Sequence, residues 1–389
     1  IKDSSNTIKS TEGKYYLENS KYEFNKRVNV YNNDSDIKSF KLDYYSDTEK
    51  VFFYGPTVIT GQDYRIFSEK GFYNTKTKNG FFNTKAKIEY SNRTITGDSL
   101  IFDDLKKYAS GKNNVTILDT INKTIIKGNF AEIFKELDSA MITRNSYAIK
   151  LLEKDSLFIK ADTLFAIGPD KNRIIKGRYD VKFFKNNMSG KSDKFIMNQK
   201  NGLIKLLRNK LSEREQQILT SKEISKKNPV IWNGESQMTG DEIHIIRNIK
   251  TNRLDSLKIL NNAFVIEKDS FGINNYNQMK GIDLFGNFKD NELEKIRLNR
   301  NTEMIYYLYD EESKELIGID KAICSSILMT INNNKIDEII FYTNPEGKVY
   351  PEMELEINEK ILNGFNWRIN EKILNCLLYT SDAADELRS

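Results

Sequence analysis

The chain has 389 residues, of which 39% are hydrophobic and 11% aromatic, with only five prolines, and this composition excludes a disordered protein. Its 60 lysines and arginines exceed its 55 acidic residues by five, and the two signs are interspersed, so we expect no nucleic acid partner. The sequence lacks an apolar stretch long enough for a transmembrane helix, and its two cysteines do not support a disulfide framework.

A short phrase recurs along the chain, in which a polar anchor residue is followed by alternating apolar side chains. The anchors are 29, 31, 33, 31 and 48 residues apart, and such a period predicts a repeat architecture. The clearest copies are TGDSLIF (Thr96–Phe102), KGNFAEI (Lys127–Ile133), IKADTLFA (Ile159–Ala166), GKSDKFIM (Gly190–Met197) and TGDEIHI (Thr239–Ile245), with weaker echoes FSEKGFY (Phe67–Tyr73) and CSSILM (Cys324–Met329). The anchors are Glu69, Asp98, Asn129, Asp162, Asp193 and Asp241.

The alternation within each phrase predicts a strand with one apolar face, because residues two apart in a strand share a face. Positions two and four after the anchor are almost purely apolar, whereas position three is mixed and fits an outward face. At the anchor itself, a polar residue beside Gly or Asn suits a corner turn. The candidates for the inward face are Tyr73, Leu100, Phe102, Val115, Ile117, Ala131, Ile133, Leu164, Phe195, Met197, Ile243, Ile245, Ile327 and Met329.

Each repeat offers a second strand, so that two strands fit within about thirty residues. Examples are VTIL at Val115–Leu118, VKFF at Val181–Phe184 and AFVI at Ala263–Ile266. Helical periodicity is scarce and Tyr and Phe are abundant, which favours strands. The fold class we predict is therefore all-β, an elongated stack of strand repeats and not a closed enzyme core.

Two segments depart from the repeat. Leu203–Lys227 spaces its apolar residues in a helical pattern and predicts a helical insertion between repeat regions 1–202 and 228–372. The sequence CLLYTSDAAD at Cys376–Asp385 resembles the conceptual translation of a sequencing-library adapter, so we expect residues 373–389 to be a non-native tail. The chain begins at Ile1 instead of Met, and we expect a processed or truncated start.

Catalytic constellations are hard to assemble from this sequence. His244 is the only histidine, which leaves no partner for a triad or a multi-histidine metal site, and we expect it to be a partly exposed strand residue. Paired carboxylates could in principle cleave a glycosidic bond. However, Asp98, Asp162, Asp193 and Asp241 recur at one repeat position, as corner turns require. We therefore expect no enzyme activity, no cofactor and no metal site.

Several segments, in the same order along the chain, resemble the OstA-like family, which includes periplasmic lipopolysaccharide-transport bridge proteins of the LptA type and the amino-terminal domain of the outer-membrane lipopolysaccharide assembly protein. The likeness runs from about Tyr15 to Trp367 and is greatest to the versions found in Bacteroidota. The insertion at Leu203–Lys227 is longer than the family pattern. The segments include Phe53–Ala86, Leu100–Phe134, Asp155–Ala166, KNPVIW (Lys227–Trp232), Phe288–Ile296 and YPEMEL (Tyr350–Leu355).

This resemblance implies a β-jellyroll, or β-taco, whose strands fold into a V around an apolar interior that holds lipid acyl chains. The inward residues above would then line a groove for lipopolysaccharide or lipid A in the periplasm. Like-folded inner- and outer-membrane transport proteins would add to the exposed sheet edges, and copies of this chain would associate head to tail. Two alternatives stay open: a β-solenoid carbohydrate-active enzyme, and a structural or adhesin-like solenoid whose interior is packed shut.

Overall fold

The computed structural model describes residues 6–151, 156–185, 188–310, 312–332 and 335–374. The chain forms two compact units that divide between Asp170 and Lys171. In the described residues nearly all regular structure is antiparallel strand, with two short α-helices, so the predicted all-β fold of stacked strands is confirmed. Residues 375–389, which contain most of the expected non-native tail, lie outside the described residues.

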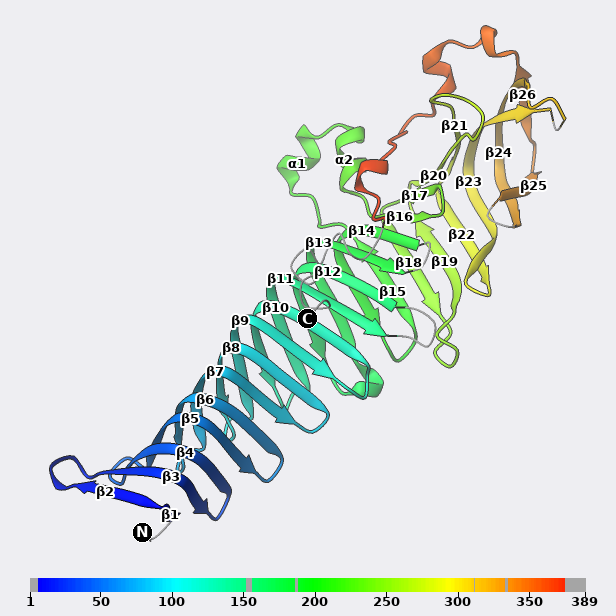
Figure 1. Ribbon diagram of the computed structural model, residues 1–389. Coiled ribbons are helices and arrows are strands. Elements are labelled where there is room, and N and C mark those ends of the chain that lie inside the picture. The colour runs from blue at the N-terminus through cyan, green and yellow to red at the C-terminus, as the bar shows by residue number, and fades with distance from the viewer. Residues whose placement is uncertain (1–5, 152–155, 186–187, 311, 333–334, 375–389) are drawn as a thin grey trace. The chain divides into compact units, whose positions relative to one another are not determined.

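Unit 1 is an antiparallel meander, in which each strand from β3 to β12 pairs with the next (Figure 1). Strands β1 and β2 both pair with β3, one with each half of it. The strands are β1 (Asn6–Lys9), β2 (Glu12–Tyr16), β3 (Lys21–Asn32), β4 (Ser35–Tyr45), β5 (Lys50–Gly61), β6 (Tyr64–Asn74), β7 (Asn79–Tyr90), β8 (Arg93–Asp103), β9 (Tyr108–Asp119), β10 (Thr124–Phe134), β11 (Ser139–Leu151) and β12 (Ser156–Ile167).

Each pairing from β3–β4 to β11–β12 shifts register once near its middle, and this shift bends every strand. The bends divide unit 1 into two arms. Arm A contains the strand halves joined by the β3–β4, β5–β6, β7–β8 and β9–β10 turns. Arm B contains the halves joined by the β4–β5, β6–β7, β8–β9 and β10–β11 turns. We call the line of bends the corner. We call the other side, where the turns of arm A meet the turns of arm B, the mouth.

Polar side chains hold the corner, as the anchors predicted. On alternate strands two successive residues adopt left-handed backbone conformations, for example Asn113 and Asn114 with φ of 58° and 51°. The Asn114 side chain donates a hydrogen bond of 3.0 Å to an Asp98 carboxylate oxygen on the neighbouring strand. In the same way, Lys85 Nζ lies 2.7 Å from Glu69 Oε1. The anchors therefore accept bonds from the bent residues beside them.

We expect Asn114→Val to destabilise unit 1 by about 1–3 kcal/mol, because a β-branched residue is strained in a left-handed conformation and the bond to Asp98 is lost. Urea unfolding measures the free energy. Thr116→Val, on the same strand but at an extended position, is the control and should cost no more than about 0.5 kcal/mol. Equal costs at the two positions would mean that the bend does not depend on this conformation.

Unit 2 also has two rows of paired strands. One row runs through β14, β15, β18, β19, β22, β23, β24 and β25, and the other through β14, β16, β17, β20, β21, β23, β24 and β26. The bounds are β13 (Ile174–Lys185), β14 (Met188–Asn198), β15 (Leu203–Leu207), β16 (Val230–Asn233), β17 (Ser236–Thr239), β18 (Glu242–Arg247), β19 (Leu254–Leu260), β20 (Ala263–Lys268), β21 (Tyr276–Gly281), β22 (Asp283–Lys289), β23 (Glu292–Tyr309), β24 (Leu316–Asn332), β25 (Lys335–Tyr342) and β26 (Glu346–Tyr350). The predicted second strands at Val115–Leu118, Val181–Phe184 and Ala263–Ile266 lie in β9, β13 and β20.

The prediction of a helical insertion over Leu203–Lys227 is wrong for its first residues. Leu203–Leu207 is strand β15, and the helices are only α1 (Glu213–Ile218) and α2 (Ser221–Lys227). The short apolar run LIKLL fits the periodicity of a helix as well as that of a strand. Pairing with β14 on one side and β18 on the other favours the strand. Each helix begins at a capping box, formed by Ser212 with Glu215 and by Thr220 with Glu223.

A C-terminal segment, residues 351–373, packs on one face of the second row of unit 2. We call it the strap. Leu355 and Leu362 join an apolar cluster with Phe264, Ile305 and other residues of that face. The Gln278 side chain donates to the Lys360 carbonyl at 2.8 Å and accepts from the Leu362 amide at 2.9 Å. Gln237 bonds the strap in the same two-way manner, to the Asn366 carbonyl and the Arg368 amide.

Candidate functional site

The inner face of arm B is built from two columns of cross-strand neighbours. One column runs Phe53, Gly71, Phe82, Leu100, Gly111, Ala131, Ile142 and Leu164, and the other runs Val51, Tyr73, Gly80, Phe102, Ala109, Ile133, Ala140 and Ala166. Both columns mix large side chains with glycine and alanine. A Cβ on Gly80 would lie 2.7 Å from the Phe82 ring, so glycine makes room for that ring. The face is therefore closely interdigitated.

Unit 2 has two equivalent columns. One runs Phe195, Leu206, Ile243, Ile259, Leu284, Leu298 and Ile327, and the other runs Met197, Ile204, Ile245, Leu257, Gly286, Ile296 and Met329. The second row of strands contributes Met238, Met279 and Met304, which are also buried. Methionine side chains are flexible and adapt to irregular apolar neighbours. The sequence interpretation did not find this methionine group, because it lies outside the repeated phrase.

The structure buries all fourteen residues predicted to face inward, each with at most 8% of its surface exposed. At the third phrase position, Ile101 is 40% exposed, and His244 and Phe165 are half-buried. The two faces of the phrase are therefore assigned as predicted. Contact of the inner face with a lipid stays a prediction.

The inner face of unit 1 is accessible at its N-terminal end. A depression of about 480 Å³ is lined there by Ile8, Tyr15, Tyr22, Phe24 and neighbours of β1 and β2. Ile8 and Phe24 belong to the buried core, whereas Tyr15 is 46% exposed and stacks on Tyr22 with ring centroids 4.2 Å apart. Among the described pairings β1 and β2 pair with β3 alone, so each has an edge with no described strand partner, although the Asn6 side chain donates a hydrogen bond of 3.1 Å to the Tyr44 hydroxyl of β4.

Polar contacts close the mouth of unit 1. Tyr64 is the first residue of β6 and Tyr73 is the last but one. An unbent strand would hold the two residues about 30 Å apart. Their hydroxyls are nevertheless 2.8 Å apart, and the Tyr64 ring centroid is 4.5 Å from that of Phe102. Burial raises the pKa of both hydroxyls, which stay protonated and can donate. Tyr64 therefore spans the mouth from arm A to arm B.

Ion pairs continue this closure on both sides of the tyrosines. Lys78 Nζ lies 2.9 Å from Asp34 Oδ2, and Lys135 pairs with Asp63. Lys135 also lies over the Tyr90 ring, 3.9 Å from its centroid. In each pair the lysine comes from a turn of arm B and its partner from arm A. The sequence interpretation missed these residues because their contacts depend on the bend, although charged turn residues were visible.

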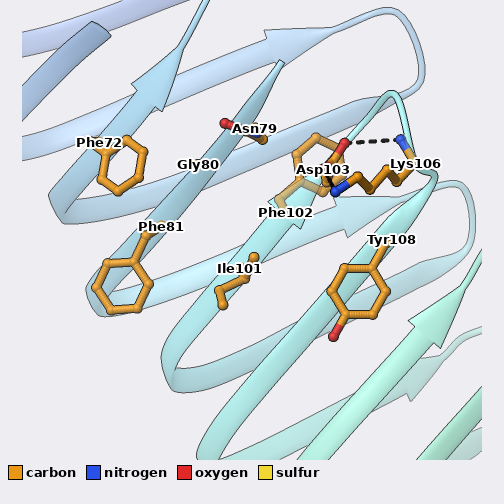
Figure 2. Close-up of a pocket in the computed structure, with 9 residues that line it drawn as sticks. All are labelled: Phe72, Asn79, Gly80, Phe81, Ile101, Phe102, Asp103, Lys106 and Tyr108. Atoms are coloured by element: carbon orange, nitrogen blue, oxygen red, sulfur yellow. Dashed lines mark hydrogen bonds and ion pairs between the residues drawn. The ribbon is translucent and has the colours of Figure 1, made fainter. Parts of the chain in front are cut away.

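A second depression, of about 640 Å³, lies on the outer face of arm B. Figure 2 shows Phe72, Phe81, Ile101 and Tyr108 side by side on neighbouring strands. Asp103 and Lys106 lie at its margin, in and beside the β8–β9 turn. Phe72, Phe81 and Ile101 face away from Leu100, whereas Gly80 and Phe102 of an inner column also line this depression.

Groups that could support catalysis are engaged elsewhere in the fold. His244 is on β18 between Lys205 and Lys258, and its Nε2 lies 3.0 Å from Glu242 Oε2. The anchor carboxylates of Asp98 and Asp241 accept hydrogen bonds from the side chains of Asn114 and Asn262. Within the described ranges, no three His, Cys, Asp or Glu residues gather as a metal site would require. No helix among the described residues has the length and apolar character needed to cross a bilayer.

Comparison with known proteins gives little guidance. No known family and no curated protein matches the sequence. Among solved structures, a similar chain is LptH of Pseudomonas aeruginosa, described as the LptA homologous periplasmic component of the lipopolysaccharide transport device. The match is 14% identical, covers 27% of this chain and 75% of LptH, and has a TM-score of 0.25. At this level the likeness carries no argument.

Proposed function

We propose that this protein is a non-enzymatic periplasmic carrier that holds the acyl chains of lipopolysaccharide or lipid A along its inner face. The observation that carries the proposal is the unbroken pair of apolar columns in each unit, which in unit 1 continues to an accessible end. Each buried methylene contributes about 0.8 kcal/mol, so one twelve-carbon chain gains up to roughly 9 kcal/mol before ordering costs. The fourteen inward residues are the proposed lining.

The free strand edges support association with like-folded partners. Among the described strand pairings, β1 and β2 pair only with β3, and β25 and β26 pair only with β24. Unpaired backbone groups at such edges accept another strand. We propose that like-folded transport proteins, or further copies of this chain, add at these edges and extend the apolar columns.

A second candidate is a structural rod with a filled core. The near-complete burial of the inner residues and the closed mouth of unit 1 favour it. The carrier and the rod differ in one respect, because only the carrier must open to admit hydrocarbon.

Photo-crosslinking in cells that make lipopolysaccharide distinguishes the lipid carrier from the structural protein with a filled core. A photoreactive residue at Leu100 or Phe195 should capture lipopolysaccharide, and the same residue at His244, on the outer face, should not. Mass spectrometry of lipids that copurify with the full chain identifies the bound species. Labelling from His244 alone would reverse the assignment of faces, and no lipid from any position would favour the structural protein with a filled core.

A further inference from the structure

Two lysines lie at the mouth of unit 1, where a bound amphiphile would place its head group. Lys78 and Lys135 each leave 24% of the side chain exposed, and each has one carboxylate partner on the opposite arm. Tyr64 and Tyr73 contact each other at the same mouth, with Asp63 as a charged neighbour of Tyr64 and Asp34 as one of Tyr73. These four side chains therefore all take part in contacts that join arm A to arm B.

Opening this mouth has a specific electrostatic consequence. A hydrocarbon tail that enters between the arms separates Asp34 from Lys78 and Asp63 from Lys135. The lysines are then left partly buried without a counter-ion, which is unfavourable. An anionic head group replaces the lost carboxylates, whereas a neutral head group does not.

We infer that Lys78 and Lys135, with the hydroxyls of Tyr64 and Tyr73, form a head-group site for a phosphate-bearing amphiphile. Phosphate suits this set, because lysine binds it as a point charge and the hydroxyls add neutral donors. In the closed protein, the carboxylates of Asp34 and Asp63 pair with the two lysines and take the place that the phosphate would have. The inference rests on the proposed binding of hydrocarbon in the interior.

Calorimetric titration of the full chain with two twelve-carbon amphiphiles, both below their micellar concentrations, tests this site. Dodecyl phosphate carries the anionic head group, and dodecyl maltoside is the neutral probe. Asp63→Asn frees Lys135 and should increase the preference for dodecyl phosphate about tenfold, the factor that 1.4 kcal/mol gives. Lys135→Gln removes the cation and should reduce that preference by a similar factor. Asp63→Asn and Lys135→Gln break the same ion pair, so opposite effects on the preference cannot come from the loss of the pair itself.

The corner supplies a matched control pair. Lys85 and Glu69 are 2.7 Å apart there, away from the mouth, and Glu69→Gln and Lys85→Gln should leave the preference unchanged. Asp34→Asn and Lys78→Gln repeat the test if a variant at Asp63 or Lys135 does not fold. Opposite shifts in preference for the aspartate and lysine variants support the site. The head-group site is wrong if both probes bind but the aspartate and lysine variants change the preference for dodecyl phosphate in the same direction. It is also wrong if the variants of the corner pair change that preference as much. If neither probe binds any variant, the proposed function itself fails.

Discussion

Leu100→Ala will destabilise unit 1 by about 2–5 kcal/mol, whereas Ile101→Ala, one position further along β8, will cost less than about 1 kcal/mol. Leu100 is fully buried between Phe82 and Gly111 on the inner face, and Ile101 is 40% exposed on the outer face. Removing the Leu100 side chain leaves a cavity in an interdigitated column, and removing that of Ile101 only enlarges a surface depression.

Urea unfolding of the full chain measures both changes. Both tryptophans, Trp232 and Trp367, lie in unit 2, so unit 1 is followed through the near-ultraviolet circular dichroism of its tyrosines. The two units need separate transitions in the fit, because a chain of two units need not unfold in one step. Equal losses for the two variants would contradict the assignment of faces, and a larger loss for Ile101→Ala would reverse it.

The repeated phrase predicted the inner face of both units because its signal is local. Leu100 and Phe102 follow Asp98 by two and four residues, and strand alternation alone puts them on one face. The same reasoning placed Phe195 and Ile243 correctly. Asp98 itself was predicted at a corner because polar residues beside glycine favour bends, and the structure adds its partner, Asn114.

Features that depend on contacts between distant residues could not be predicted in this way. Tyr64 and Tyr73 contact each other only because β6 bends between them. Leu203–Leu207 fits a helix as well as a strand until its neighbours β14 and β18 are known. The strap packs where it does through Gln237 and Gln278, two polar residues in strands whose apolar pattern gave no sign of a covering segment.

Arg368→Met will loosen the strap and destabilise unit 2 by about 1.5–3 kcal/mol, the range for hydrogen bonds that involve a charged group. The Arg368 side chain is buried and donates to the Asn228 carbonyl at 2.8 Å and to Glu371. Lys360→Met is the control within the strap, because its ion pair with Glu352 is partly exposed and should contribute about 1 kcal/mol or less.

The same variant will change the response to acid. Burial alone would raise the pKa of Glu371, but hydrogen bonds from Arg368 and Lys191 lower it to about 2. Because the folded pKa lies below the ordinary value of 4.5, the Glu371 contribution is complete above about pH 4.5 and disappears as the pH falls through about 2. Without Arg368 the folded pKa rises towards 4.5, so Glu371 contributes less stability above pH 4.5 and is protonated in the folded protein at a higher pH.

Tryptophan fluorescence reports this transition directly. Trp367 lies in the strap, with its ring centroid 5.4 Å from that of Tyr276, and Trp232 pairs with Gln237 on the covered face. In Arg368→Met the acid-induced change in fluorescence should therefore start at higher pH than in the unaltered protein, and in Lys360→Met it should not move. An unchanged acid transition in Arg368→Met would mean that the strap is held by its apolar contacts and the two glutamines alone.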